Sequence, residues 1–242
     1  MYAVGLNQHH SIEELLRGGA DPNLQMGDEG VTALHILAET SPAIIMNPVR
    51  EKTIQNIMTL LLAYGANVDS RDTQGYTPLI RASQVRHYTT LRLLLENGAN
   101  VFAESEDNIC ALSNAAWLGE PENIEELLHW GAGNNQKQLQ WAFHATFWDY
   151  HEFYAMILIR AGLKIGISEA VMLVYLEQIY DERAWQKPID IPPGKQLLHK
   201  LLRSHQVTKD EIDDALKRAI EYRLPDTKTH LFRYREQLHK QR

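Results

Sequence analysis

The sequence predicts an all-α solenoid, in which helix-turn-helix units with short hairpin turns stack side by side and end on a helical C-terminal cap. Two observations lead to this prediction: a tripeptide recurs at a fixed period, and the same apolar pattern precedes every copy. The tripeptide is Gly-Ala-(Asp/Asn), and it lies at Gly19–Asp21, Gly65–Asn67 and Gly98–Asn100, with Gly131–Gly133 as a variant. The steps from Gly65 to Gly98 and from Gly98 to Gly131 are both 33 residues, which is typical of stacked helical repeats.

A pair of leucines before each tripeptide predicts the second helix of each unit. The pairs are Leu15-Leu16, Leu61-Leu62, Leu94-Leu95 and Leu127-Leu128. The glycine that follows can end this helix, because it reaches the left-handed conformation required there without strain. A weaker fifth copy, Met156–Gly162, has its glycine 31 residues after Gly131. Such a unit cannot bury its apolar face alone, so neighbouring units must stack.

The first helix of each unit is expected to begin at a threonine motif. In Thr32-Ala33-Leu34-His35 and Thr77-Pro78-Leu79 the hydroxyl can cap the helix, and proline suits the first turn, where its missing N–H costs nothing. These motifs resemble the Thr-Pro-Leu-His signature of the ankyrin-repeat family, and Asp72–Tyr76 looks like the turn that precedes it. The resemblance implies two antiparallel helices and one projecting turn per unit.

The fourth and fifth copies depart from the family pattern. Cys110–Ser113 replaces the motif in the fourth copy. In the fifth copy we assign Trp141 to the threonine position and His144 to the histidine position. Helices are still expected in both copies.

Two stretches exceed the repeat and are expected to lie between the two helices of a unit. Gly19 to Gly65 is 46 residues, and the surplus falls around Thr40–Lys52. A sixth, degenerate unit is expected to have helices near Ser168–Ile179 and Gln196–His205, joined by the proline-rich residues 181–194. Because both insertions lie between the two helices of their units, they should project from the same edge of the solenoid. We call this edge the rim, and Trp185 would be its apolar anchor.

The repeat pattern ends after Val207, and a helical cap is expected there. Thr208–Glu211 matches a capping box, and a final helix is expected from Thr227 to Gln241. The apolar residues of the first cap helix share one face and are Ile212, Ala215, Leu216, Ala219 and Ile220. We therefore divide the chain into ankyrin repeats at 1–166 and a degenerate final repeat plus cap at 167–242.

The charge distribution argues against a nucleic-acid partner. The net charge is −7, with 12 Lys+Arg and 24 Asp+Glu in residues 1–194 against 12 and 7 in residues 195–242. The acidic body lacks the basic stripe that phosphate backbones require. No apolar run is long enough to span a bilayer, and the first residues do not predict a secretory signal peptide. With Cys110 as the single cysteine, we expect a reducing, intracellular and cytoplasmic environment.

No catalytic, cofactor or metal site is predicted. There are 11 histidines, but neither a His-Glu-x-x-His motif nor paired cysteines with zinc spacing. His35 and His144 fall where the family histidine bonds to neighbouring backbone. Cys110 falls where a repeat threonine would cap a helix, which favours a structural role over a nucleophilic one.

The ankyrin resemblance implies a binding surface on the hairpin tips and on the exposed side of the first helices. Carried over to this chain, the partner-binding positions are Arg71, Gln74, Tyr76, Gln84, Glu104, Asp107, Trp117, Leu118 and Trp148. Arginine, tyrosine and tryptophan are enriched in interface hot spots. Trp117 either faces this groove, where Trp148 would extend an apolar patch, or folds back onto the neighbouring repeat.

We therefore expect a non-enzymatic module that binds a partner protein with a basic, apolar segment and takes no small-molecule substrate. The alternative is an enzyme or lipid-binding element in residues 165–242, with the repeats as its substrate adaptor. Divergent repeats and long insertions also resemble the ankyrin proteins that intracellular bacteria deliver into host cells.

Overall fold

The computed structural model resolves two compact units, residues 1–163 and 164–242, which are described separately below. The residues it describes are 9–40, 48–85, 88–146, 154–179, 194–203 and 207–240. Within these ranges the secondary structure is helical, apart from the isolated bridges Met26–Val31 and Glu104–Cys110. The predicted all-α fold is confirmed.

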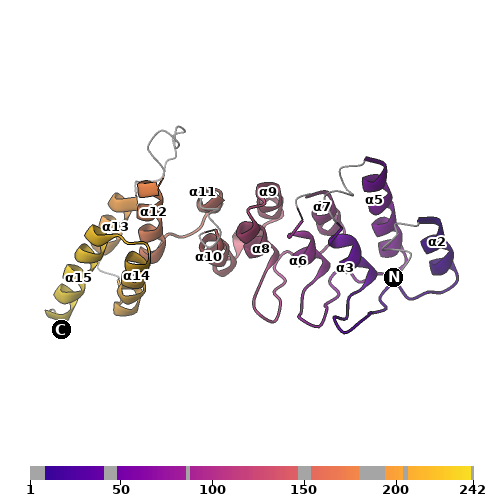
Figure 1. The fold of residues 1–242 in the computed structure, drawn as a ribbon, viewed down its shortest axis with the longest axis horizontal. Helices are drawn as coiled ribbons and strands as arrows, with labels where there is room; N and C mark the ends of the chain where they lie inside the picture. Colours follow the sequence, from indigo (N-terminus) through magenta and orange to yellow (C-terminus); the bar gives the residue numbers. More distant parts are fainter. Residues whose placement is uncertain are drawn as a thin grey trace. The chain divides into compact units, whose positions relative to one another are not determined.

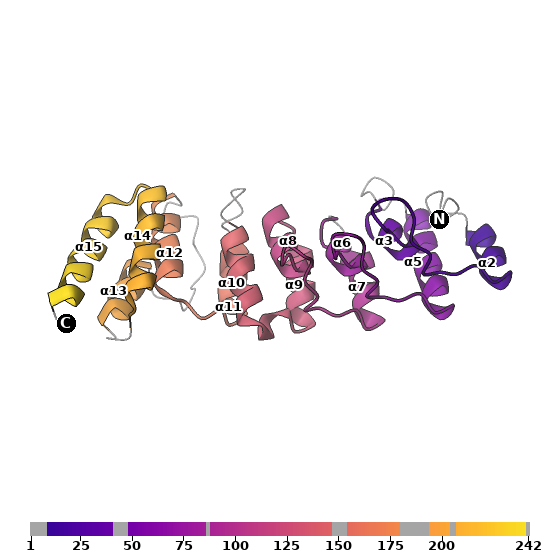
Figure 2. The same cartoon turned by 90° about the horizontal axis from the view of Figure 1, so that it is seen from below.

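The first unit is a row of helix pairs (Figures 1 and 2). Its helices are α2 (His9–Arg17), α3 (Ala33–Ala38), α5 (Pro48–Ala63), α6 (Pro78–Ala82), α7 (Tyr88–Glu96), α8 (Ala111–Leu118), α9 (Pro121–His129), α10 (Gln136–Ala145) and α11 (Ala155–Arg160), with a short 3-10 turn η1 (Ala132–Asn134). The first helices α3, α6, α8 and α10 pack against one another in sequence, and the second helices α7 and α9 pack beside them. The row is therefore two helical layers deep.

Glycine ends the second helices as the sequence predicts. Gly65, Gly98 and Gly131 have φ angles of 86°, 84° and 93°. After the first of these turns, the N–H of Ala66 bonds back to the carbonyl of Leu61 at 2.9 Å, which satisfies a helix-end acceptor. The leucine one turn before each of these three glycines is buried, so the repeated pattern forms the core between units.

The first helices are capped by the motif residue at their start. The hydroxyl of Thr77 accepts the N–H of Ile80 at 3.3 Å. The Cys110 sulfur occupies the same place and accepts the N–H of Ser113 at 3.4 Å. A thiol is a weaker acceptor than a hydroxyl, but the Cys110 sulfur caps its helix in the same geometry as the Thr77 hydroxyl.

Two details of the predicted repeat are wrong. Helix α5 begins at Pro48, so residues 48–52 belong to a lengthened second helix instead of a projecting insertion. Helix α10 begins at Gln136 and is capped by Asn135, whose side chain accepts the N–H of Gln138 at 3.3 Å. Trp141 and His144 therefore lie inside a helix that starts earlier than the fifth motif indicated.

The second unit is a four-helix cluster around one apolar core. It contains α12 (Ile167–Ile179), α13 (Gly194–Arg203), α14 (Lys209–Glu221) and α15 (Pro225–Lys240). Core residues from all four helices are buried, for example Val171, Leu202, Ile212 and Leu231. The predicted capping box is present, since the N–H of Thr208 donates to the Glu211 carboxylate at 2.8 Å. Trp185 and most of the proline-rich stretch lie outside the described residues.

Truncation of a core leucine should destabilise the repeats. Leu94 and Leu127 are both 0 % exposed, so Leu94→Ala or Leu127→Ala should each lower the free energy of unfolding by about 2–5 kcal/mol. Urea denaturation followed by circular dichroism measures this loss. The matched control is Leu15→Ala, because Leu15 is 54 % exposed at the same place in the first copy. Equal losses at Leu94 and Leu15 would contradict the stacked-core interpretation.

Candidate partner-binding surface

Three hairpins project side by side from the first layer of helices (Figure 1). Hydrogen bonds between main chains join them: the N–H of Thr73 donates to the carbonyl of Glu29 at 2.9 Å, and the N–H of Glu106 donates to the carbonyl of Gln74 at 3.1 Å. Each tip is thus fixed by its neighbour. The row presents side chains on a supported edge rather than on independent loops.

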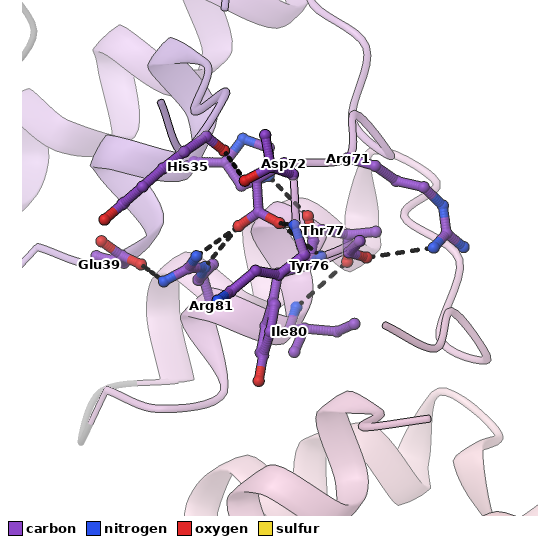
Figure 3. Close-up of polar contacts among 12 residues, drawn as sticks. His35, Glu39, Arg71, Asp72, Tyr76, Thr77, Ile80 and Arg81 are labelled. Atoms are coloured by element: carbon purple, nitrogen blue, oxygen red, sulfur yellow. Dashed lines mark hydrogen bonds and ion pairs between the residues drawn. The ribbon is translucent and has the colours of Figure 1, made fainter. Parts of the chain in front are cut away.

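A buried carboxylate organises the middle hairpin (Figure 3). The Asp72 side chain accepts the N–H groups of Gln74 and Tyr76, each at 2.9 Å, and forms an ion pair with Arg81. Arg81 also reaches Glu39 at 2.6 Å, across to the preceding repeat. Burial alone would lower the pKa of Arg81, but its bonds to these two carboxylates outweigh burial and raise it. The turn and the junction between repeats therefore share one network.

His35 ties the same hairpin to the preceding repeat. Its Nδ1 accepts the N–H of Thr32 at 3.2 Å, which leaves the proton on Nε2 to donate to the carbonyl of Tyr76 at 2.9 Å. Burial lowers the pKa of His35, so the ring is neutral near pH 7. The expected structural role of this histidine is confirmed.

Two of the predicted partner-binding residues, Arg71 and Glu104, make contacts that link neighbouring hairpins and α10. Arg71 Nη1 donates to the carbonyl of Glu104 at 2.8 Å and to that of Gly75 at 3.2 Å. The Glu104 carboxylate accepts Gln138 Nε2 at 2.9 Å and lies 3.4 Å from Lys137 Nζ. Both side chains make these contacts before any partner is bound.

The other predicted residues lie in varied surroundings. The ring of Tyr76 packs under the Arg81 guanidinium, 4.7 Å from its carbon to the ring centre. Gln74 is exposed at a hairpin tip, Gln84 is exposed just after α6, and Leu118 is half-buried at the end of α8. Trp148 lies outside the described residues.

A groove of about 470 Å³ brings Asp107 and Trp117 together with residues of α10. It is lined mainly by apolar surface, and its residues include Asp107, Ile109, Asn114, Trp117, Trp141 and His144. Trp117 is 50 % exposed. Lys137 Nζ lies 4.3 Å from the centre of the Trp141 ring, an arrangement that favours a cation over the indole face.

The irregular fifth unit explains why this groove is open. Only residues 130–135, which include the 3-10 turn η1, separate α9 from α10, so no hairpin projects here as it does before α3, α6 and α8 (Figure 1). The fifth repeat motif did not predict Trp141 as a groove residue, because it placed this residue at the start of a helix. The available signal was Asn135, since asparagine is among the preferred N-cap residues.

The surroundings of Cys110 disfavour a nucleophilic role for its thiol. Cys110 is buried, and its burial raises the pKa of the thiol, which disfavours the nucleophilic thiolate. No group of three or more metal-ligating side chains gathers within the part of the chain that is described. In the same residues, no helix combines the length and apolar character needed to cross a membrane.

Stacked helix pairs, hairpins joined edge to edge and an open groove define a repeat protein of the interaction-module class. The chain belongs to the ankyrin-repeat family: the family description "Ankyrin repeats (3 copies)" matches residues 1–104 and 44–138. The predicted family is confirmed.

Similar repeats occur in curated proteins that include three from Mus musculus. SH3 and multiple ankyrin repeat domains protein 1 of Mus musculus is 32 % identical over 127 residues, covering 52 % of this chain and 5 % of that protein. B-cell lymphoma 3 protein homolog of Mus musculus is 33 % identical over 110 residues, covering 45 % and 22 %. RelA-associated inhibitor of Mus musculus is 28 % identical over 156 residues, covering 59 % and 17 %. The chain thus spans a small part of these relatives.

Replacement of the buried carboxylate of Asp72 should lower the free energy of unfolding more than replacement of Ser105, which occupies the same place in the next hairpin. Asp72→Ala leaves two N–H groups and Arg81 without their acceptor, so the free energy of unfolding should fall by about 3–5 kcal/mol. The control is Ser105→Ala, because the Ser105 hydroxyl accepts a single N–H, from Ile109 at 3.1 Å. That loss should be about 1 kcal/mol. Urea denaturation compares the two, and similar losses would show that the Asp72 network is not central.

Proposed function

We propose that this chain is a non-enzymatic module that binds a partner protein through the concave face of its ankyrin repeats, with the groove at Trp117 as the central contact. The observation that supports this most is the half-exposed Trp117 beside a mainly apolar groove. A large aromatic side chain that the core does not need is the usual anchor of an interface hot spot. The printed name of one relative, RelA-associated inhibitor, also describes association with another protein.

The charge around the groove favours a basic, apolar segment of the partner. Residues 1–163 contain 9 Lys+Arg and 19 Asp+Glu. Asp107 lies at the groove itself, and Glu106 is exposed on the same hairpin. Apolar side chains of the partner would fill the space between Trp117 and Trp141, while a lysine or arginine would approach Asp107. Arg71 and Glu104 would act by holding the hairpins in place.

The finer expectations stay predictions. They are cytoplasmic action, delivery into a host cell, and contacts from Trp148 and from the predicted rim, of which residues 48–52 are no longer part because they belong to α5. The enzyme alternative for residues 165–242 stands as a competing hypothesis.

Loss of the exposed indole should weaken partner binding. Cross-linking from cell lysate followed by mass spectrometry identifies the partner, and isothermal titration calorimetry then measures its affinity. Trp117→Ala should cost about 1–4 kcal/mol of binding free energy with unchanged helical content. The matched control is Trp130→Ala, because Trp130 is 40 % exposed but lies at the end of a second helix, where its Nε1 donates to Glu126.

A third variant separates the groove from the rim. A chain shortened within residues 181–193 should bind as the unchanged chain does. If that variant loses binding while Trp117→Ala retains it, the groove is not the site. Equal losses for Trp117→Ala and Trp130→Ala would also contradict the proposal.

A further inference from the structure

An asparagine followed by a glycine ends the second helix of the third repeat. Asn97 comes directly after α7 and is exposed, and Gly98 has a φ angle of 84°. Every other asparagine of the chain is followed by a residue that has a side chain. Because glycine lacks a Cβ, its main-chain nitrogen is the least hindered of these for an attack on the preceding asparagine side chain.

Stacking of the repeats does not require an amide at position 97. The described bond of the Asn97 side chain stays within its own helix, since Nδ2 donates to the carbonyl of Leu93 at 2.8 Å. The residues that precede the repeat glycine in the other copies are Gly18, Tyr64, Trp130 and Ala161. Residues of such different size and polarity occupy this place without changing the turn, so packing does not explain the asparagine.

The turn at Gly98 is open to solvent. A methyl group at Gly98 would meet no heavy atom of a non-adjacent residue within 4 Å. The adjacent carboxylate, Glu96, lies 3.7 Å from Arg92, which also lies 3.3 Å from Glu126 of α9. Glu96 and Asn97 are both exposed, so water reaches the side-chain amide.

Hydrogen bonds keep the two reactive groups of this dipeptide apart. The N–H of Gly98 donates to the carbonyl of Leu95 at 3.0 Å, and the N–H of Ala99 donates to the carbonyl of Leu94 at 3.0 Å. Attack by the Gly98 nitrogen therefore requires that the last turn of α7 opens. Helix ends open at a lower free energy than the core of a domain, so this opening occurs without global unfolding.

We propose that Asn97 is a site of spontaneous deamidation whose rate is set by the opening of the last turn of α7. The Gly98 nitrogen forms a bond to Cγ of Asn97, the Cγ–Nδ2 bond breaks, and the proton of the Gly98 nitrogen leaves with Nδ2 as ammonia. Water then opens the resulting succinimide at either of its two carbonyl groups. The products at position 97 are aspartate and isoaspartate.

The isoaspartate product should loosen the junction with the preceding repeat. It lengthens the main chain by one carbon directly before a turn that depends on the bond from Ala99 to Leu94. In the same turn the N–H of Asn100 donates to the Asp69 carboxylate of the preceding repeat at 2.9 Å. The new carboxylate also lies at the negative end of the α7 dipole. This inference does not rest on the partner-binding groove.

Peptide mapping of the aged full chain tests the site. A protease that cleaves after Glu96 and Glu104 releases residues 97–104, which contain Asn97 and Asn100 but no other asparagine. Mass spectrometry should find the exchange of ammonia for water at Asn97 and not at Asn100, which precedes the β-branched Val101. Protein isoaspartyl methyltransferase should label the aged chain but not an aged Asn97→Gln variant. Equal conversion of both asparagines, or none at Asn97, would overturn the proposal.

Two leucine variants test the dependence on local opening. Leu94→Ala removes a buried side chain from the last turns of α7 and should speed conversion by about 5–30-fold. The control is Leu231→Ala, because Leu231 is equally buried but lies in the C-terminal unit, so the rate should stay within about twofold. A free peptide of residues 93–104 should convert about 10-fold faster than the folded chain. Equal rates in the peptide and the folded chain would contradict the proposed control by the helix end.

Thermal unfolding measures the effect on the junction. The chain that carries isoaspartate, separated from the unmodified chain by ion exchange, should have a Tm lower by about 2–4 °C. Asn97→Asp adds the charge without the longer main chain, so its Tm should fall less. If the isoaspartate form and the unmodified chain have the same Tm, the proposed loosening of the junction is wrong.

Discussion

Stacking of one repeat on the next is the constraint on which the first unit depends. A single helix pair leaves one face of its leucines exposed, and only a neighbour covers it. The polar contacts also depend on a neighbouring repeat. His35 donates to the carbonyl of Tyr76 in the following repeat, and Arg81 reaches back from there to Glu39. Because apolar and polar contacts cross the same junctions, the helices and hairpins keep one register along the row.

This constraint divides the surface residues into two groups. Arg71 and Glu104 lie on the hairpin edge, where their polar atoms contact neighbouring hairpins and α10. Trp117 has half of its surface exposed beside the groove. Position within the repeat therefore does not by itself determine whether a side chain is available to a partner. Availability depends on what the adjacent repeat places within hydrogen-bond distance.

The sequence predicts those features that arise from local chemistry. Glycine at Gly98 and threonine at Thr77 act within one turn of a helix, so their roles follow from residue type and spacing. The role of Arg71 depends on a main-chain carbonyl 33 residues away, at Glu104, and no local pattern shows it. Trp141 was misassigned because the repeat length shortens before α10. The stack of His199 on His230 joins helices that no repeat motif relates.

The groove at Trp117 lies where the regular repeat pattern breaks. It opens beside α10, which begins without a projecting hairpin. Regular positions are constrained by two neighbours, so their side chains mostly serve stacking. Where the pattern breaks, Trp117 can be half-exposed at less cost to stability. In a repeat protein, binding residues are therefore expected at positions where the sequence departs from the repeat pattern.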